Sequence, residues 1–420
     1  MNEIAKKINN TLILNILLIS ILIYNSGYAL VTAEKNYAVY TLLFGLILLF
    51  PYILKINFID KKVNTHFLFF IILIVAIIFA LLSNFQVDSQ TINSYAGMIL
   101  LIFFSFIITC SFKFKDFLDI FIRIMVIITA ISLIFYFILN FTTLNFNENI
   151  FINVNGAKYQ NFYVYFSMLK SPERNTGIFW EPGLFGSFII FAIMLEIVFK
   201  KKIKFLNILI LFIGLLTTQS TASYLLIIPM IILLINKKVK NKNKVFLILI
   251  LALMFLVSII YKDNILYLLY SWNPDMFSKL YDEVGATTTT RIFSPFLNFQ
   301  IFIKNPIFGV GFKNATRLYN ELLMQNYGIV DAQTSTTMYM IASLGVFGLF
   351  YTVFIFIGIF KNNQIDLLTK IIMTIVILLI INKEPHSQIV FTWCLIFYLL
   401  KINYNEPEED LIIDQKELII

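Results

Sequence analysis

Long apolar stretches, separated by short polar or basic segments, dominate this chain. A helix needs roughly 20 apolar residues to cross the hydrocarbon core of a bilayer. Stretches of this kind lie near residues 11–31, 37–54, 66–84, 95–112, 117–140, 182–200, 203–217, 219–236, 245–262, 336–360, 365–383 and 387–402. We therefore predict an all-α integral membrane protein with about 12 transmembrane helices, forming a single polytopic membrane domain over residues 1–420.

The composition supports this class. Apolar residues make up 59% of the chain and charged residues only 13%, whereas roughly a quarter of a soluble domain is charged. So little charge cannot cover a water-facing surface, which excludes a nucleic-acid binder, a disordered scaffold and a disulfide-rich secreted domain. The net charge of +8 is instead interpreted as a report on topology, because short cytoplasmic loops of membrane proteins are enriched in lysine and arginine.

Two features of the span assignment leave alternatives. The apolar stretch over 203–236 is interrupted by Thr217-Thr218-Gln219-Ser220-Thr221, which favours two short spans joined by a polar hairpin over one long span. The first span resembles a cleaved signal loosely at Val31-Thr32-Ala33. Its apolar region is longer than the roughly 7–15 residues typical of a signal, so we favour a retained helix.

The lysines predict which loops are cytoplasmic. With Lys6 and Lys7 inside, most lysines fall in alternate, inner segments, and the four short outer segments carry only Lys35 and Lys383. Because this alternation persists to the last span, both termini are predicted to be cytoplasmic.

Two outer segments are long, residues 141–181 (outer loop three) and residues 263–335 (outer loop five). Functional residues collect in long loops on a rigid scaffold. A transporter usually carries ionisable residues at mid-membrane, but the centres of these spans are nearly free of charge. We therefore expect a site at the outer membrane face. The two cysteines and two histidines show no metal-ligand spacing, so no metal site is predicted.

Three of the four arginines, Arg174, Arg291 and Arg317, lie in the two long outer loops. Arginine is favoured where phosphate is bound by a planar, bidentate group. The alternative is that these arginines are ordinary solvated charges.

Outer loop three ends in the run Arg174-Asn175-Thr176-Gly177-Ile178-Phe179-Trp180-Glu181-Pro182-Gly183. Pro182 suits the first position of the following helix, which places Glu181 at its N-terminus. There the carboxylate either caps the helix or acts as a general base for a sugar hydroxyl, and the two roles compete because capping lowers its pKa. Trp180, beside this carboxylate, suits an interfacial anchor.

Outer loop five runs from Arg291 to Lys304-Asn305-Pro306-Ile307-Phe308-Gly309-Val310-Gly311. Glycines such as Gly309 and Gly311 allow the backbone to approach a ligand closely. Phe293, Phe296, Phe299 and Ile303 recur at helical spacing, which fits a helix along the membrane interface and equally a helix packed on other spans.

The order and motifs of these loops resemble the O-antigen polymerase and O-antigen ligase superfamily (Wzy-type and WaaL-type proteins), whose polymerases have long third and fifth outer loops. The run Arg174 to Gly183 resembles the arginine-then-EPG stretch of one polymerase subgroup. Arg291 through Pro306 to Gly311 resembles an arginine followed by the superfamily's hPxxGxG element. Thr334 stands where ligases have a histidine, which favours a polymerase. Some polymerases have an arginine and a glycine separated by fifteen residues in each long loop. This spacing is absent after Arg174 and Arg291, so the resemblance does not assign a separate role to each of these two arginines.

The resemblance implies a GT-C-like membrane fold and a glycosyltransferase that joins oligosaccharide repeats carried on undecaprenyl diphosphate, at the outer face of the bacterial cytoplasmic (inner) membrane. It also makes Trp180 a candidate for stacking on sugar or lipid carrier. It implies Arg174 and Arg291 as catalytic contacts to the diphosphate, with Arg317 and Lys304 as further contacts, and no metal, nucleotide or other cofactor. Glu181 is the preferred base, and Glu384 and His386 at the last outer turn are alternatives. The expected partners are the lipid-linked donor and acceptor, the bilayer, a chain-length regulator and a flippase. A ligase, or a polysaccharide flippase, is the alternative function.

Overall fold

The computed structural model describes residues 2–32, 35–54, 65–83, 89–142, 149–153, 156–238, 271, 286–329 and 333–401. Its first half contains α1 (Asn2–Tyr24), η1 (Ala29–Thr32), α2 (Lys35–Ile53), α3 (Thr65–Ser83), α4 (Ser89–Ser111), α5 (Phe114–Phe141), β1 (Ile150–Ile152), β2 (Lys158–Asn161), β3 (Phe166–Met168), α6 (Pro182–Phe199) and α7 (Phe205–Thr217). Its second half contains α8 (Thr221–Leu225), α9 (Ile227–Lys238), α13 (Ala286–Lys304), α14 (Phe312–Tyr327), α15 (Thr336–Leu344), η2 (Gly345–Gly348), α16 (Leu349–Phe360), α17 (Leu367–Lys383), η3 (His386–Gln388) and α18 (Val390–Lys401).

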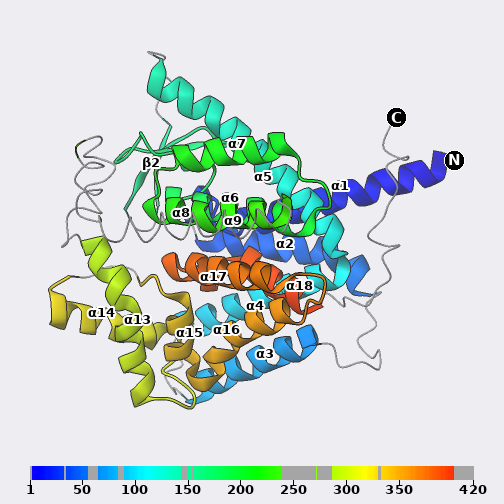
Figure 1. The fold of residues 1–420 in the computed structure, drawn as a ribbon. Coiled ribbons are helices and arrows are strands. Elements are labelled where there is room, and N and C mark those ends of the chain that lie inside the picture. Colours follow the sequence, from blue (N-terminus) through cyan, green and yellow to red (C-terminus); the bar gives the residue numbers. More distant parts are fainter. Residues whose placement is uncertain are drawn as a thin grey trace.

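Most of the described chain is a bundle of apolar helices, as the sequence predicts (Figure 1). Within the described ranges, six helical segments are long and apolar enough to cross a membrane: Thr65–Ser83, Ile92–Ser111, Phe114–Phe141, Pro182–Phe199, Thr221–Lys238 and Thr336–Phe360. Each of the other predicted spans coincides with a helix (α1, α2, α7, α17 or α18), except the one near 245–262, which lies outside the described residues. A helix rises about 1.5 Å per residue, so the short helices Phe205–Thr217 and Val390–Lys401 do not cross a bilayer by length alone, and the count of about 12 crossings stays a prediction.

Contacts between distant segments gather at the two ends of the bundle. At one end, hydrogen bonds join outer loop three to the turn after α1 and to the α7–α8 turn, and join the start of α15 to the end of α17. At the other end, Lys237 donates to the carbonyl of Ile197, Lys361 to Thr65, and Lys401 to the carbonyl of Thr109. The segments predicted to be outer thus lie together, and the basic segments lie together at the opposite end. Which end faces the cytoplasm is a prediction from the lysines.

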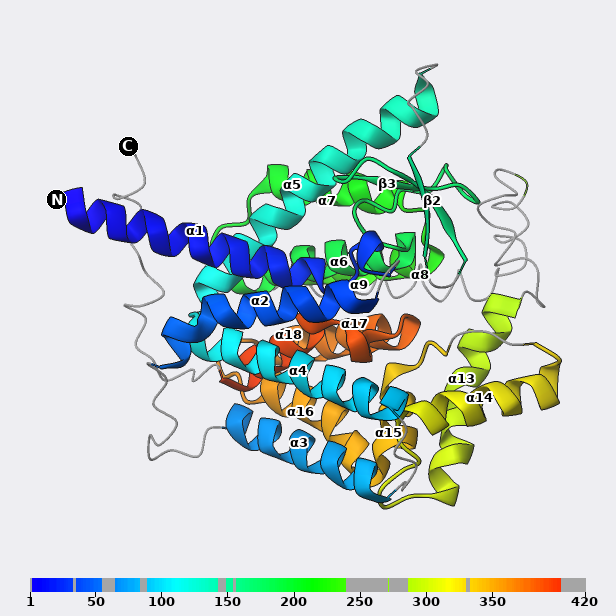
Figure 2. The ribbon, with the colours of Figure 1, turned by 180° about the vertical axis from the view of Figure 1, so that it is seen from behind.

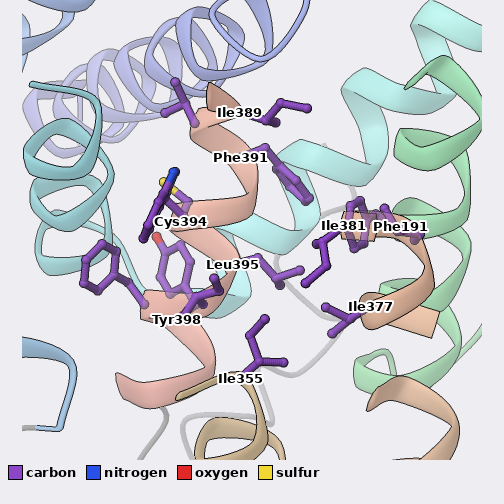
Figure 3. Packing of buried hydrophobic residues seen from close by; sticks show 14 of the residues in the cluster. Phe191, Ile355, Ile377, Ile381, Ile389, Phe391, Cys394, Leu395 and Tyr398 are labelled. Atoms are coloured by element: carbon purple, nitrogen blue, oxygen red, sulfur yellow. The ribbon is translucent and has the colours of Figure 1, made fainter. Parts of the chain in front are cut away.

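The helices α6 and α18 form the centre of the bundle. In α6, 89% of the 18-residue apolar window is buried, and every residue of α18 from Val390 to Leu400 is buried. A helix that is apolar on all faces belongs in a core. Figure 3 shows Leu395 and Tyr398 of α18 among the buried side chains of the bundle, and the ring of Phe391 contacts those of Phe121 in α5 and Phe191 in α6.

Outer loop three is not purely irregular, and here the all-α prediction needs a correction. Its described residues form a three-stranded antiparallel sheet in the order β1-β2-β3, beside the ends of α1 and α8 (Figure 2). Residues Phe151 and Tyr159 are paired between β1 and β2, and Tyr159 is paired with Met168 of β3. Aromatic pairs such as Phe151 and Tyr159, with ring centroids 5.0 Å apart, stabilise neighbouring strands. The strands are too short for the alternation of apolar and polar residues to reveal them in the sequence.

Candidate active site

The end of outer loop three is fixed to the α7–α8 turn by the fully buried Asn175. Its backbone N–H donates to the carbonyl of Thr217 at 2.9 Å, and its side-chain amide donates to the hydroxyls of Thr217 and Ser132 at 2.9 and 3.1 Å. Arg174, the preceding residue, donates from Nε to the carbonyl of Thr218 at 3.4 Å. The predicted catalytic arginine of this loop is therefore held against the polar turn that precedes α8.

Glu181 occupies the N-cap position of α6, and Pro182 is the first helical residue, as predicted. The side chain of Glu181 makes no capping hydrogen bond, so of the two alternatives for this carboxylate, side-chain capping of α6 is not what the structure shows. Burial and then the nearby Glu181 raise the pKa of Tyr159, which places the carboxylate close to β2. A carboxylate that does not cap is the form that suits a general base.

The most important contact of the site lies above Gly183, in the first turn of α6. A Cβ atom on this glycine would stand 2.5 Å from Oε1 of Glu384 and 3.6 Å from Oε1 of Glu181. Two carboxylates from distant parts of the sequence therefore share one small space. We call Glu181 and Glu384 the carboxylate pair. Glu384 is buried, with 3% of its surface exposed, and Glu181 is half-buried.

Lys383 adds a buried cationic side chain beside this pair. It is 7% exposed, and its Nζ donates to Oγ of Ser223 in α8 at 2.7 Å. A Cβ on Gly186 would stand 2.3 Å from that same hydroxyl oxygen. Gly183 and Gly186 lie on one face of α6. Glu384 approaches this face at Gly183, and the Ser223 hydroxyl that binds Lys383 approaches it at Gly186. Sequence analysis did not name Lys383 as a site residue. A signal was available, because Lys383 is one of only two lysines in the four short outer segments.

Hydrogen bonds hold the turn between α17 and α18 against the start of α15. Oγ1 of Thr336 donates to the carbonyl of Glu384 at 3.1 Å and accepts the backbone N–H of His386 at 2.7 Å. Ser335 donates to Oδ1 of Asn382 at 2.9 Å. These contacts place the C-terminal end of outer loop five next to the carboxylate pair, as expected for two loops that share a site.

His386 is enclosed rather than presented to the carboxylate pair. Its Nδ1 lies 2.8 Å from Oγ1 of Thr392, and its ring is in an edge contact with Phe191 of α6 at 6.2 Å. Burial, and secondarily the charge of Lys383, lower its pKa from 6.5 to about 3. The imidazole is therefore neutral at physiological pH. Nε2 is buried and has no hydrogen-bond partner within the described chain.

The predicted residues of outer loop five lie on α13, on α14 and in the connection between them. Arg291 belongs to α13, but its side chain is outside the described part of the structure. Lys304 ends α13 and is exposed. Arg317 is exposed on α14, where it pairs with Glu321 one turn away at 2.7 Å. An exposed pair of this kind contributes little to stability, so the arginine is available to another anion.

The glycines of this loop contact the chain itself. Gly309 and Gly311 have φ of +66° and +78°, and a Cβ on Gly309 would stand 2.5 Å from the carbonyl oxygen of Ser343. The N–H groups of Val310 and Gly311 donate to the carbonyls of Ala342 and Ser343 at 3.0 and 2.9 Å. The close backbone approach that the glycines allow is thus made to α15. Their binding of substrate stays a prediction.

Trp180 lies between the first helical hairpin and the small sheet. Its backbone N–H donates to the carbonyl of Gly27 at 3.1 Å, and its carbonyl accepts the hydroxyl of Tyr159 at 2.6 Å. The side chain is half-buried, next to the carboxylate of the following residue. This position suits a wall of the site.

Comparison of the chain with protein-family models finds no match, and comparison with curated proteins finds none either.

Proposed function

We propose that this protein is a membrane-bound glycosyltransferase that polymerises undecaprenyl-diphosphate-linked oligosaccharide repeats into O-antigen or capsular polysaccharide. The observation that carries the proposal is the carboxylate pair at Gly183, with Lys383 beside it and with Arg174 of outer loop three held against the α7–α8 turn. A reaction between a sugar hydroxyl and a glycosyl diphosphate needs a base and fixed positive charge, and this end of the bundle offers both.

In the proposed reaction, Glu181 accepts the proton of the acceptor hydroxyl as its oxygen attacks the anomeric carbon of the donor. The bond from that carbon to the diphosphate oxygen breaks, and undecaprenyl diphosphate leaves with the bonding electrons. Arg174 and Lys383 stabilise the negative charge that develops on the leaving group. Because the diphosphate already activates the donor, neither a nucleotide nor a metal is part of the proposal.

The two carboxylates differ in a way that favours Glu181 as the base. Glu181 is half-buried and makes no capping hydrogen bond, so its oxygens are free to meet an acceptor. Glu384 is buried at the turn held by Thr336, which suits a residue that orients Glu181 or the acceptor. Arg291, Arg317 and Lys304 belong to the proposal as contacts to the second lipid-linked substrate.

The proposal includes the setting of the enzyme. We infer a site on the outer face of the bacterial cytoplasmic membrane, with both termini in the cytoplasm, and with a flippase and a chain-length regulator as partners. A ligase is the second candidate. Thr334 occupies the position of the ligase histidine, and the carboxylate pair offers a base elsewhere, so the polymerase is favoured. A flippase needs polar groups along a path between the two ends, and the described charges lie mainly near the ends.

Three variants test the assignment in a strain that lacks the chromosomal gene. We expect Glu181→Gln to abolish long polymer, since removal of a general base typically costs about 10²–10⁴-fold in rate, and Glu384→Gln to shorten it strongly. Glu173→Gln is the matched control, because Glu173 lies in the same loop with an exposed side chain. Protein amounts in the membrane are measured in parallel. Normal chain length with Glu181→Gln contradicts its role as the base.

A further inference from the structure

Helix α13, in outer loop five, has an apolar face that the rest of the described chain does not cover. Phe296, Phe299 and Ile303 are 62%, 45% and 59% exposed, whereas Leu297 and Ile301 on the other side are 2% exposed. The buried side packs on α15, and its polar residues Ser294 and Asn298 hydrogen-bond within that contact. The exposed residues recur at spacings of three and four, so they form one stripe along the helix.

This stripe continues into the apolar surface of the membrane spans. Ile307, just beyond α13, is 60% exposed, and Phe308 stacks on Phe79 of α3 at 5.7 Å and on Phe347 of η2 at 6.3 Å. Only 33% of the apolar window of α3 is buried. In a membrane, the uncovered surface of this 19-residue apolar helix faces acyl chains. The stripe on α13 therefore adjoins a surface that is already assigned to lipid.

The direction of α13 differs from that of the spans. Figures 1 and 2 show α13 running across the end of the bundle, whereas α3 and α16 run along it. Its C-terminal end is held at that level by the hydrogen bond from the N–H of Val346 to the carbonyl of Pro306 at 2.8 Å. A helix that crosses the ends of the spans lies close to the plane of the membrane surface.

Polar residues border the stripe where an interfacial helix needs them. Gln300 and Lys304 are exposed along the edge of α13, and Lys313 is exposed at the start of α14. Amphipathic helices at membrane interfaces bury an apolar face at the boundary of headgroups and acyl chains and keep lysine among the phosphates. The stripe itself, formed by Phe296, Phe299, Ile303 and Ile307, contains no charged residue.

We propose that α13 is an in-plane interfacial helix whose stripe lies among the acyl chains of the outer leaflet. The α13 segment of outer loop five then lies in the membrane interface instead of in water. A helix at this depth would hold Lys304 at the level of lipid phosphates. The inference does not depend on the proposed function, because it concerns only where the helix lies.

Spin labels in vesicles of phosphatidylethanolamine and phosphatidylglycerol test the position of the stripe. Phe299→Cys and Ile303→Cys are labelled in a Cys110→Ala, Cys394→Ala background. Val75→Cys on α3 is the lipid-facing reference, and Gln325→Cys on the exposed side of α14 is the water-facing reference. We expect labels at 299 and 303 to collide with oxygen, which partitions into acyl chains, as readily as the label at 75, and to be protected from a water-soluble nickel chelate.

Two results would overturn the inference. Access of the nickel chelate to residues 299 and 303 equal to that at 325 would place the stripe in water. Protection from both reagents would mean that protein covers it. If the cysteine-free background does not fold, Phe299→Trp and Gln325→Trp in the natural chain give the same comparison through quenching by brominated lipids. Stronger quenching at 299 than at 325 is expected, and equal quenching contradicts the proposal.

Discussion

Oxygen atoms of Glu384 and Glu181 lie 2.5 and 3.6 Å, respectively, from the point that a Cβ on Gly183 would occupy. One carboxylate precedes α6 and the other follows α17. The absence of a side chain at residue 183 is what lets the turn after α17 approach the first turn of α6. One turn further along α6, the missing side chain of Gly186 leaves space for the hydroxyl of Ser223, which accepts a hydrogen bond from Lys383.

The substitution Gly183→Ala tests this space. Alanine is the better helix former by about 1 kcal/mol, so α6 should still form, but the added methyl group collides with Glu384. We expect long polysaccharide to be lost while the protein remains in the membrane. Gly97→Ala in α4 is the control, since nothing lies within 4 Å of its added Cβ. Unchanged chain length in the Gly183→Ala strain would show that the two carboxylates need not approach each other.

Replacement of Lys383 tests the buried cation. Lys383→Met keeps the length of the side chain and removes its charge, and we expect a fall in polymer synthesis of about 10²–10³-fold, typical of losing a transition-state contact. Lys383→Arg should retain part of the activity. Lys370→Met, in the same helix but at its opposite end, is the control. Polymer formation in isolated membranes, normalised to protein amount, measures the effect, and equal rates for Lys383→Met and Lys370→Met would exclude the role.

His386 should make folding sensitive to acid. Its pKa falls from 6.5 to about 3 on folding because of burial, so between these values the unfolded chain binds a proton that the folded chain does not. Stability is then fully present above about pH 6.5 and declines toward pH 3 by roughly 1.4 kcal/mol per pH unit. In detergent, the melting temperature of His386→Gln should fall less steeply with acidification than that of the natural chain. Parallel curves would mean that His386 does not titrate in this way.

The glycines at the contact of outer loop five with α15 provide a stability test. Gly309→Ala forces a side chain into a left-handed conformation and against backbone atoms 2.5 Å away, whereas Gly328→Ala shares the positive φ but meets open space. The conformational cost alone is about 1–2 kcal/mol. We expect Gly309→Ala to lower the melting temperature clearly more than Gly328→Ala. A smaller or equal effect would show that the contact with Ser343 contributes little.

The sequence predicts the bundle well because each apolar stretch carries its own signal. The limits of α5 and α6 lie within a few residues of their predicted spans, and Pro182 marks the start of α6. Sequence-local reasoning also singled out Arg174, from the placement of the arginines, and Glu181, from its position before Pro182; their roles stay predictions. It did not predict the break of the 336–360 span at Gly345–Gly348, where close backbone contact with Ile307 and Gly309 decides the local conformation.

The parts of the site that were missed depend on contacts between distant segments. The residues adjacent to Glu384 in the sequence do not indicate that its carboxylate lies next to Gly183, because this contact depends on how α6 and α17 pack. The glycines of outer loop five suggested a ligand, but a missing Cβ permits approach by any group, and in the structure that group is the backbone of α15. The sheet of outer loop three rests on strands of three or four residues, too short for a periodic signal.

Analysis of lipid-linked glycans in a deletion strain tests the proposed function most directly. If the protein is a polymerase, its deletion should leave single repeat units on undecaprenyl diphosphate or attached singly to the lipid A core. The natural gene should then restore long chains, and the Glu181→Gln variant should not. Long chains stranded on undecaprenyl diphosphate would instead identify a ligase, and single units confined to the cytoplasmic face would identify a flippase. Either of these two results would contradict the proposed polymerase.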